Sequence, residues 1–260
     1  MTPAFLVLFF LLAIPARAAD EGTLTDDPLA GELDVPESIA RANEGITTHL
    51  EDGDIKPNMQ RNADPCVRRG CKWPKYGRYV YVPVSISSAY TRTERNVIIR
   101  GLLTFHASTC IRFVWRRTHR QFIHFYSGSG CWSSMGRQSR GQAVSLRKNG
   151  CVSTGTVQHE VLHALGFNHE QVRSDRDNYV SILFQNIRRG RERQFQKKAT
   201  NNLGTPYDFN SVMHYGNFAF SKNRRPTIIS KANPNLRIGG AKYMSQNDVS
   251  RVNRLYQCRV

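Results

Sequence analysis

Two histidines lie four residues apart, with a glutamate beside the first, in the stretch His159-Glu160-Val161-Leu162-His163. On a helix, residues i and i+4 share a face, so both imidazoles can reach one metal ion. Glu160 projects differently, beside the ion rather than onto it, where it can accept a proton from a water molecule. The motif predicts a hydrolytic metal site, although three fixed residues also occur by chance on an exposed helix.

The residues that follow supply a third candidate ligand. Gly166 can adopt a left-handed conformation and turn the chain, which brings His169 back towards the two helical histidines. Three protein ligands with an open position are typical of catalytic zinc, whereas structural zinc sites are closed. The complete spacing is the metzincin signature. We therefore expect one Zn²⁺ ion per catalytic domain, bound by His159, His163 and His169.

Longer motifs indicate a family. The run Gly166-Phe-Asn-His-Glu-Gln-Val-Arg-Ser-Asp-Arg-Asp177 resembles the astacin family of zinc endopeptidases, and Ser211-Val-Met-His-Tyr215 resembles that family's Met-turn. The resemblance extends from about Asn62 to Cys258. It implies an α+β fold in which two subdomains flank a zinc cleft, with a mixed twisted sheet and a long zinc-binding helix.

The same resemblance implies roles for individual residues. Glu160 corresponds to the general base, and Tyr215 to a labile zinc ligand that swings away and donates to the oxyanion. Met213 corresponds to the apolar base under the metal. Glu170 corresponds to a glutamate that interacts with a newly formed amino terminus, which a cut after Arg61 would create at Asn62.

Periodicity and capping signals independently predict strands mixed with helices, an order that indicates an α+β protein. Thr91 with Glu94, and Ser245 with Asp248, have capping-box spacing at the starts of two helices, and the helix that carries the histidines ends at Gly166. We expect strands at 78–87, 110–115, 121–126 and 144–146, and helices at 91–108, 154–165 and 246–257.

Charge divides the chain into three parts. The 260 residues carry a net charge of +17, but residues 20–61 hold eleven acidic and three basic residues. Phe5–Ile14 is an apolar run of signal-peptide length, and no later run is long enough to span a membrane. We expect a signal peptide at 1–19, an acidic propeptide at 20–61 and a catalytic domain at 62–260, released by a protease that cuts near Arg61.

One acidic residue of the propeptide has a specific expected role. Astacin propeptides carry a Phe-x-Gly-Asp element whose aspartate occupies the zinc site, and Glu51-Asp52-Gly53-Asp54 is similar to it except at the first position. The resemblance implies that Asp54 binds zinc in the zymogen only. The alternatives are that Asp54 is one of eleven solvated acids, and that the acidic stretch is a disordered tail rather than a segment folded against the enzyme.

Six cysteines indicate the secretory route, where disulfides persist, and they allow fifteen pairings. The family core implies Cys110–Cys258 and Cys131–Cys151. The remaining pair, Cys66–Cys71, closes a short loop. This extra pair resembles the six-cysteine astacins of bony fish, which include hatching enzymes.

The leading interpretation is a secreted, monomeric zinc endopeptidase, made as a zymogen and stored in secretory granules or released directly. Its expected substrates are extracellular matrix or egg-envelope proteins. The alternatives are a six-cysteine astacin acting in another tissue, a scaffold that has lost catalysis, and a polyanion-binding protein. Two basic clusters favour the last, but no nucleic-acid motif accompanies them: they comprise Arg188, Arg189, Arg191, Arg193, Lys197 and Lys198, and Arg112, Arg116, Arg117 and Arg120.

Overall fold

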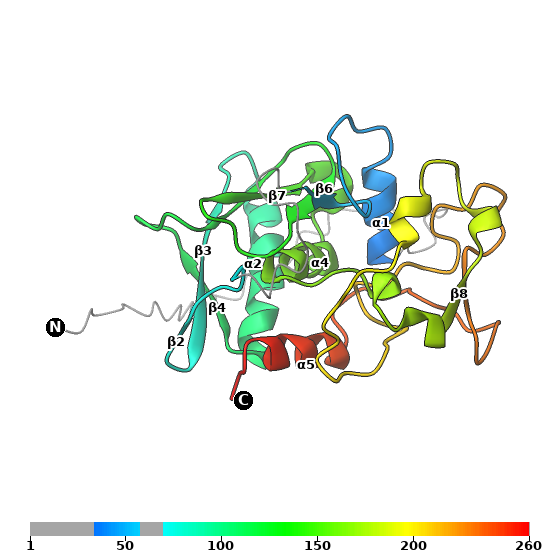
Figure 1. Ribbon diagram of the computed structural model, residues 1–260. Helices are drawn as coiled ribbons and strands as arrows, with labels where there is room; N and C mark the ends of the chain where they lie inside the picture. Colours follow the sequence, from blue (N-terminus) through cyan, green and yellow to red (C-terminus); the bar gives the residue numbers. More distant parts are fainter. Residues whose placement is uncertain (1–33, 58–69, 260) are drawn as a thin grey trace, which may run out of the picture. The chain divides into compact units, whose positions relative to one another are not determined.

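The computed structural model describes residues 34–57 and 70–259 (Figure 1). The predicted signal peptide and the boundary at Arg61 and Asn62 lie outside the described residues. Within the described part, the helices are α1 (Val35–Ala42), α2 (Arg92–Ser108), α3 (Lys148–Cys151), α4 (Thr154–Leu165) and α5 (Gln246–Leu255). The strands are β1 (Ile55–Lys56), β2 (Lys75–Tyr76), β3 (Tyr79–Ile86), β4 (Ile111–Trp115), β5 (Ile123–Tyr126), β6 (Cys131–Ser134), β7 (Gln142–Leu146), β8 (Val180–Ile182) and β9 (Ile228–Ser230). Short 3₁₀ helices are η2 (Glu170–Val172), η3 (Arg176–Asn178), η4 (Phe184–Asn186) and η5 (Glu192–Phe195).

A mixed sheet forms one half of the protein. Its strand order is β1-β6-β7-β5-β3-β2, with β4 also paired to β3. The pairs β3–β4, β3–β5 and β5–β7 are parallel, whereas β6–β7 is antiparallel. In β3, Val80, Val82, Val84 and Ile86 are buried, because alternate side chains of a strand point to the same face of the sheet.

Helices α2 and α4 pack together beside this sheet. Helix α4 contacts α2, α1 and β6 and lies between α2 and α1 (Figure 1). All of α4 from Gly155 to Leu165 is buried. The two helices approach closely at Gly101 of α2, where a Cβ atom would lie 2.6 Å from Val157 Cγ1. This close packing fixes the position of the helix that carries two of the predicted ligands.

A second hydrophobic cluster belongs to the carboxy-terminal half. It is built on long loops, the 3₁₀ helices and the small antiparallel sheet of β8 and β9. Its buried members include Val180, Phe195, Tyr215 and Ile228. The residues of α4 belong to the first cluster. Two separate cores, one sheet-based and one loop-based, match the expected α+β architecture with two subdomains.

The predicted elements are present with shifts at their ends. Helix α4 has the predicted bounds, and α2 begins at the predicted Thr91 cap, where Thr91 and Glu94 form a capping box. Helix α5 has its predicted Ser245 cap but ends at Leu255, two residues early, with Gln257 at φ 50°. The short strands β6, β8 and β9 and helix α1 were not predicted, because each offers too few residues for a periodic pattern.

Two disulfides tie the sheet-based half together. The structure contains the expected pairs Cys110–Cys258 and Cys131–Cys151, with Cα–Cα distances of 5.3 and 5.6 Å. Cys71 is also disulfide-bonded, and the Cys66 predicted as its partner lies outside the described residues. The first bridge attaches the residues after α5 to the start of β4.

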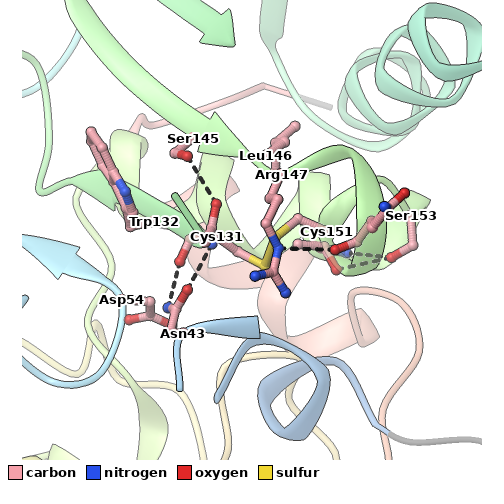
Figure 2. Close-up of a disulfide and its surroundings, with 12 residues drawn as sticks. Asn43, Asp54, Cys131, Trp132, Ser145, Leu146, Arg147, Cys151 and Ser153 are labelled. Carbon is pink, nitrogen blue, oxygen red and sulfur yellow. Dashed lines mark hydrogen bonds between the residues drawn. A yellow bond between two sulfur atoms is a disulfide. The ribbon is translucent and has the colours of Figure 1, made fainter. Parts of the chain in front are cut away.

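Residues 34–57 are an acidic stretch, called segment 34–57 below. They fold against the remainder of the chain and do not form a disordered tail. Asp34 caps α1 through Glu37 N and also accepts a hydrogen bond from Gly240 N. The Asn43 side chain pairs with both backbone groups of Cys131, at 2.7 Å each (Figure 2). Strand β1 then extends the sheet beside β6 in parallel register. The segment is therefore attached through backbone groups as well as charges.

No helix within the described residues is long and apolar enough to cross a membrane.

The close approach at Gly101 generates the first prediction. Gly to Ala in a helix interior normally stabilises by about 0.5–1 kcal/mol. For Gly101→Ala we expect the opposite sign, a loss of about 1–3 kcal/mol in the free energy of unfolding, because the new methyl group overlaps the Val157 side chain. Urea denaturation measures the change.

A Val157→Gly background provides the control, because the new Cβ atom would lie 2.6 Å from Val157 Cγ1 and 2.7 Å from Val157 Cβ, and only glycine at 157 removes both atoms. In that background Gly101→Ala should no longer destabilise the protein. A Gly101→Ala protein more stable than the parent would contradict the packing argument.

Candidate metal centre

The ends of α4 fix two predicted ligands and direct the third. Ser153 caps the amino terminus of α4 through Thr156 N, and Gly166 ends the helix at φ 108°. This left-handed residue reverses the chain, and His169 follows three residues later. The Nε2 atoms of His163 and His169 lie 3.2 and 3.3 Å from His159 Nε2. The structure therefore brings the three predicted histidines together around one point.

The separations of these nitrogens fit zinc. Two nitrogens bound at about 2.05 Å to a tetrahedral ion lie about 3.3 Å apart. All three imidazoles are buried, and His159 and His163 present Nε2 because each Nδ1 faces a backbone carbonyl, of Val212 at 2.8 Å and Phe167 at 2.7 Å. A carbonyl only accepts, so each Nδ1 carries the proton and leaves the Nε2 lone pair for a metal. Burial lowers the pKa of His163 to about 4, which keeps that ring neutral.

Asp54 supplies a fourth donor from segment 34–57. Its Oδ2 lies 3.0 Å from His159 Nε2 and 3.2 Å from His169 Nε2, and its Oδ1 lies 3.4 Å from His163 Nε2. Burial opposes its ionisation, but the imidazoles of His169 and His163 and a hydrogen bond with His159 hold the pKa of Asp54 well below its usual range. Among the described residues, these four donors form one candidate metal site, a ligand set typical of tetrahedral zinc.

A tight loop carries Asp54 into the site. Glu51 and Ile55 exchange two backbone hydrogen bonds of 2.8 and 2.9 Å. Between them, Asp52 and Gly53 both have positive φ, at 49° and 91°. A Cβ atom on Gly53 would lie 2.8 Å from the Tyr215 hydroxyl. Glycine is therefore required here both for the backbone conformation and for the close approach.

Glu160 lies beside the ligands without joining them. It is fully buried, and neither carboxylate oxygen has a hydrogen-bond partner among the described residues. Burial, and next the charge of Asp54, raise its pKa well above the ordinary range. A buried carboxylate with no protein partner is unusual, and its position beside the ligands suits a proton acceptor for a water molecule at the metal.

Tyr215 is close to the ligands, but its hydroxyl is engaged elsewhere. Its ring centroid lies 4.8 Å from that of His169. The hydroxyl donates a hydrogen bond to the carbonyl oxygen of Asp52. Burial, followed by the charges of Asp54 and Asp52, raises the pKa of Tyr215 well above its ordinary value. With segment 34–57 in place, the tyrosine bonds to that segment.

The turn before Tyr215 is linked to the histidine site by backbone hydrogen bonds. Met213 is 2% exposed, and its carbonyl accepts a 2.9 Å hydrogen bond from Glu170 N. Val212, whose carbonyl fixes His159, is itself fixed by Asp248 Oδ2, which accepts from Val212 N at 3.0 Å. Asp248 also accepts from Ser211 Oγ at 2.6 Å.

Sequence reasoning found Asp248 only as part of the α5 capping box. Its carboxylate serves both the α5 cap and the turn, with Ser245 N donating to the same Oδ2 that holds Val212. The link between positions 211 and 248 arises from tertiary packing, so no local pattern indicates it. Burial raises the pKa of Asp248 despite these hydrogen bonds.

Glu170 is paired with two arginines. It is 1% exposed, accepts from both terminal nitrogens of Arg251, and lies 3.1 Å from Arg173 Nη1. It also accepts from Asp208 N at 2.7 Å. The amino group expected to reach it, at Asn62, lies outside the described residues. A small cavity of about 80 Å³ adjoins Glu170 and His169.

Comparisons with known proteins agree with this geometry. The sequence model of the peptidase family described as Astacin matches residues 68–257. High choriolytic enzyme 2 of Oryzias latipes is 44% identical over 87% of this chain and 82% of its own, and Low choriolytic enzyme of the same fish is 41% identical over 92% and 90%.

A solved structure is similar throughout its length. It is described as High choriolytic enzyme 1, a hatching enzyme zinc-protease from Oryzias latipes, and it is 45% identical. The alignment has a TM-score of 0.73 and covers 76% of this chain and 100% of the other. Together with the histidine cluster, these matches show that the chain belongs to the astacin family of zinc metalloendopeptidases.

Proposed function

We propose that this chain is a secreted zinc endopeptidase made as a zymogen, and that it cleaves extracellular proteins, egg-envelope proteins among them. The position of Asp54 against the three histidines supports latency, because its carboxylate takes the place that a substrate or water would need. The names of the relatives as choriolytic and hatching enzymes support the substrate class.

The proposal divides the chain as the sequence predicts. Residues 1–19 serve as a signal peptide, residues 20–61 as the inhibitory propeptide and residues 62–260 as the enzyme, released by a cut near Arg61. The fold of segment 34–57 supports this division, since the segment contributes one helix, one edge strand and Asp54 but no core of its own. A non-hatching role in another tissue is the alternative substrate assignment.

In the processed enzyme, His159, His163 and His169 would hold the zinc ion. The metal would supply Lewis acidity for the scissile carbonyl and for a water molecule. Glu160 takes a proton from the attacking water and returns it to the leaving amine, a role that suits its raised pKa and its unpartnered oxygens. Once Asp52 has left, the Tyr215 hydroxyl is free to donate to the oxyanion.

Replacement of Glu160 by Gln tests the proposed base. The amide keeps the shape of the side chain but accepts no proton, so we expect kcat to fall by roughly 10²-fold or more. Zinc content should remain one ion per chain, because Glu160 is not a ligand. Hydrolysis of a quenched fluorescent peptide and metal analysis of the same protein measure both quantities.

A chelator provides the matching loss-of-metal control, because it should abolish the activity of the parent enzyme. Normal cleavage by Glu160→Gln would remove this residue from the mechanism.

Replacement of Asp54 by Asn tests the latency mechanism. The amide is a poorer zinc ligand than a carboxylate and loses the charge attraction of the site. In chains kept uncut by Arg61→Gln, we expect Asp54→Asn to raise peptidase activity at least tenfold, about 1.4 kcal/mol. A chelator should also extract zinc faster from this variant.

Glu51→Gln is the matched control for this experiment. Glu51 belongs to the same loop, is exposed and, within residues 34–57 and 70–259, is bonded to Ile55 through its backbone, so the variant should remain latent. An uncut Asp54→Asn chain as inactive as the Glu51→Gln chain would exclude Asp54 as the inhibitory ligand.

A further inference from the structure

A buried tyrosine and a buried histidine next to the metal centre take no part in the proposed chemistry. The Tyr207 hydroxyl lies 2.7 Å from His214 Nε2. The other ring nitrogen of His214, Nδ1, lies 2.7 Å from the carbonyl oxygen of Tyr215. Tyr207 is 7% exposed and His214 is fully buried. The pair therefore ends on the backbone of the residue proposed to stabilise the oxyanion.

The direction of both hydrogen bonds follows from the chemistry of the groups. A carbonyl oxygen only accepts, so His214 Nδ1 carries a proton and donates it to Tyr215 O. Burial lowers the pKa of His214 to about 4, which keeps the ring neutral and leaves a lone pair on Nε2. Burial also raises the pKa of Tyr207, so its hydroxyl keeps the proton that Nε2 accepts. The Tyr207 hydroxyl thereby favours the tautomer of His214 that bonds to Tyr215.

Tyr207 is itself held in place by the residues on either side of it. Pro206 O accepts from Arg173 Nη1 at 2.9 Å, and Asp208 N donates to Glu170 Oε1 at 2.7 Å. Arg173 and Glu170 are paired with each other at 3.1 Å. The chain on both sides of Tyr207 is therefore bonded to the segment that follows the third histidine ligand, so its hydroxyl has a fixed position relative to that ligand.

The backbone of Tyr215 is held from its other end as well. Its N–H donates to Gln171 Oε1 at 3.3 Å, and Gln171 is fully buried. The N–H and the carbonyl of Tyr215 are thus both bonded to buried side chains. A shift of this backbone would break one of these bonds and leave a buried polar group unpaired, which is unfavourable.

The side chain of Tyr215, by contrast, is bonded to a segment that leaves. Its hydroxyl donates to Asp52 O of segment 34–57. Its ring lies among the rings of His169, Phe195 and Phe220, with centroid distances of 4.8, 6.0 and 5.5 Å. When the segment departs, the backbone contacts remain and the hydroxyl alone loses its partner.

We propose that Tyr207 and His214 are positioning residues for the peptidase reaction. They hold the backbone of Tyr215 in place, so that its hydroxyl exchanges Asp52 O for the oxyanion by rotation of the side chain alone. Neither residue touches the substrate. The inference rests on the proposed function and adds to it the two residues that set the position of Tyr215.

Removal of the Tyr207 hydroxyl tests the proposal in enzyme activated by proteolysis of the full chain. In Tyr207→Phe the ring remains, but His214 Nε2 loses its donor and the favoured tautomer is no longer selected. We expect kcat for a quenched fluorescent peptide to fall about tenfold, less than the roughly 10²-fold that a displacement of about 1 Å can cost. KM should stay within about twofold, because the pair does not bind substrate.

A double-mutant cycle separates positioning from a general structural effect. In a Tyr215→Phe background the hydroxyl to be positioned is absent, so Tyr207→Phe should lower kcat by less than about twofold. A structural defect would lower kcat by the same factor in both backgrounds. Equal factors would therefore overturn the proposal.

Tyr90→Phe is the matched control for loss of a buried hydroxyl. Tyr90 is 3% exposed and donates a 2.7 Å hydrogen bond to Leu146 O in the sheet-based half. The variant should lose stability in urea to about the same extent as Tyr207→Phe and keep the parental kcat. Zinc content should be unchanged in every variant, because none of the replaced tyrosines is among the four donors of the candidate metal site.

NMR of the parent protein with labelled histidine nitrogens tests the tautomer without any substitution. His214 should be protonated at Nδ1 and bare at Nε2. The opposite tautomer would overturn the proposal, and this measurement holds even if Tyr207→Phe fails to fold.

The outcomes separate the two proposals. Failure of the parent enzyme to cleave the peptide, or a parental kcat in Tyr215→Phe, would contradict the proposed function itself. A parental kcat in Tyr207→Phe, with an active parent and a slow Tyr215→Phe, would overturn only the roles of Tyr207 and His214.

Discussion

The convergence of three buried imidazoles on one point is the constraint on which the rest of the structure depends. Each ring is removed from water. The second nitrogens of His159 and His163 have backbone partners, whereas His169 Nδ1 has none among the described residues. For His159 that partner is Val212 O, which Asp248 holds in place from α5. For His163 it is Phe167 O, which the left-handed Gly166 turns back towards the helix. The capping of α5 and the ending of α4 are therefore parts of the metal site.

Burial of two carboxylates in one site shapes its electrostatics. Asp54 lies against the imidazoles and has a lowered pKa, whereas Glu160 lacks such partners and has a raised pKa. Burial acts on both, and the neighbouring groups decide which one carries the charge. The charge of Asp54 is the second cause of the raised pKa of Glu160, after burial. Departure of Asp54 removes that second cause, whereas burial remains.

The sequence predicted the site better than the scaffold around it. The histidine spacing, the glycine turn and the helix caps are local patterns, so α4 and the position of His169 could be derived from them. Strand β6 has only four residues and α1 eight, too few for a periodic signal. The contacts of Asp248 with Val212 and of Lys198 with Asp52 join residues that are distant in the sequence, so no local spacing reveals them. Asp54 was predicted from the resemblance to a family. Its own sequence surroundings could not single it out, because it is one of many acidic residues there.

The loop of segment 34–57 also explains how a peptide can occupy a peptidase without presenting a bond to be cut. The chain forms a tight loop here, closed by the Glu51–Ile55 backbone hydrogen bonds and turned by Asp52 and Gly53 at positive φ. The loop places the side-chain carboxylate of Asp54, and not a peptide bond, against the imidazoles. A substrate must instead lay its backbone across the metal so that its carbonyl carbon is exposed to water. Beyond the loop, β1 runs parallel to β6. Attraction between an acidic segment and a basic enzyme would hold many acidic peptides, so it is the geometry of this loop that distinguishes an inhibitor from a substrate.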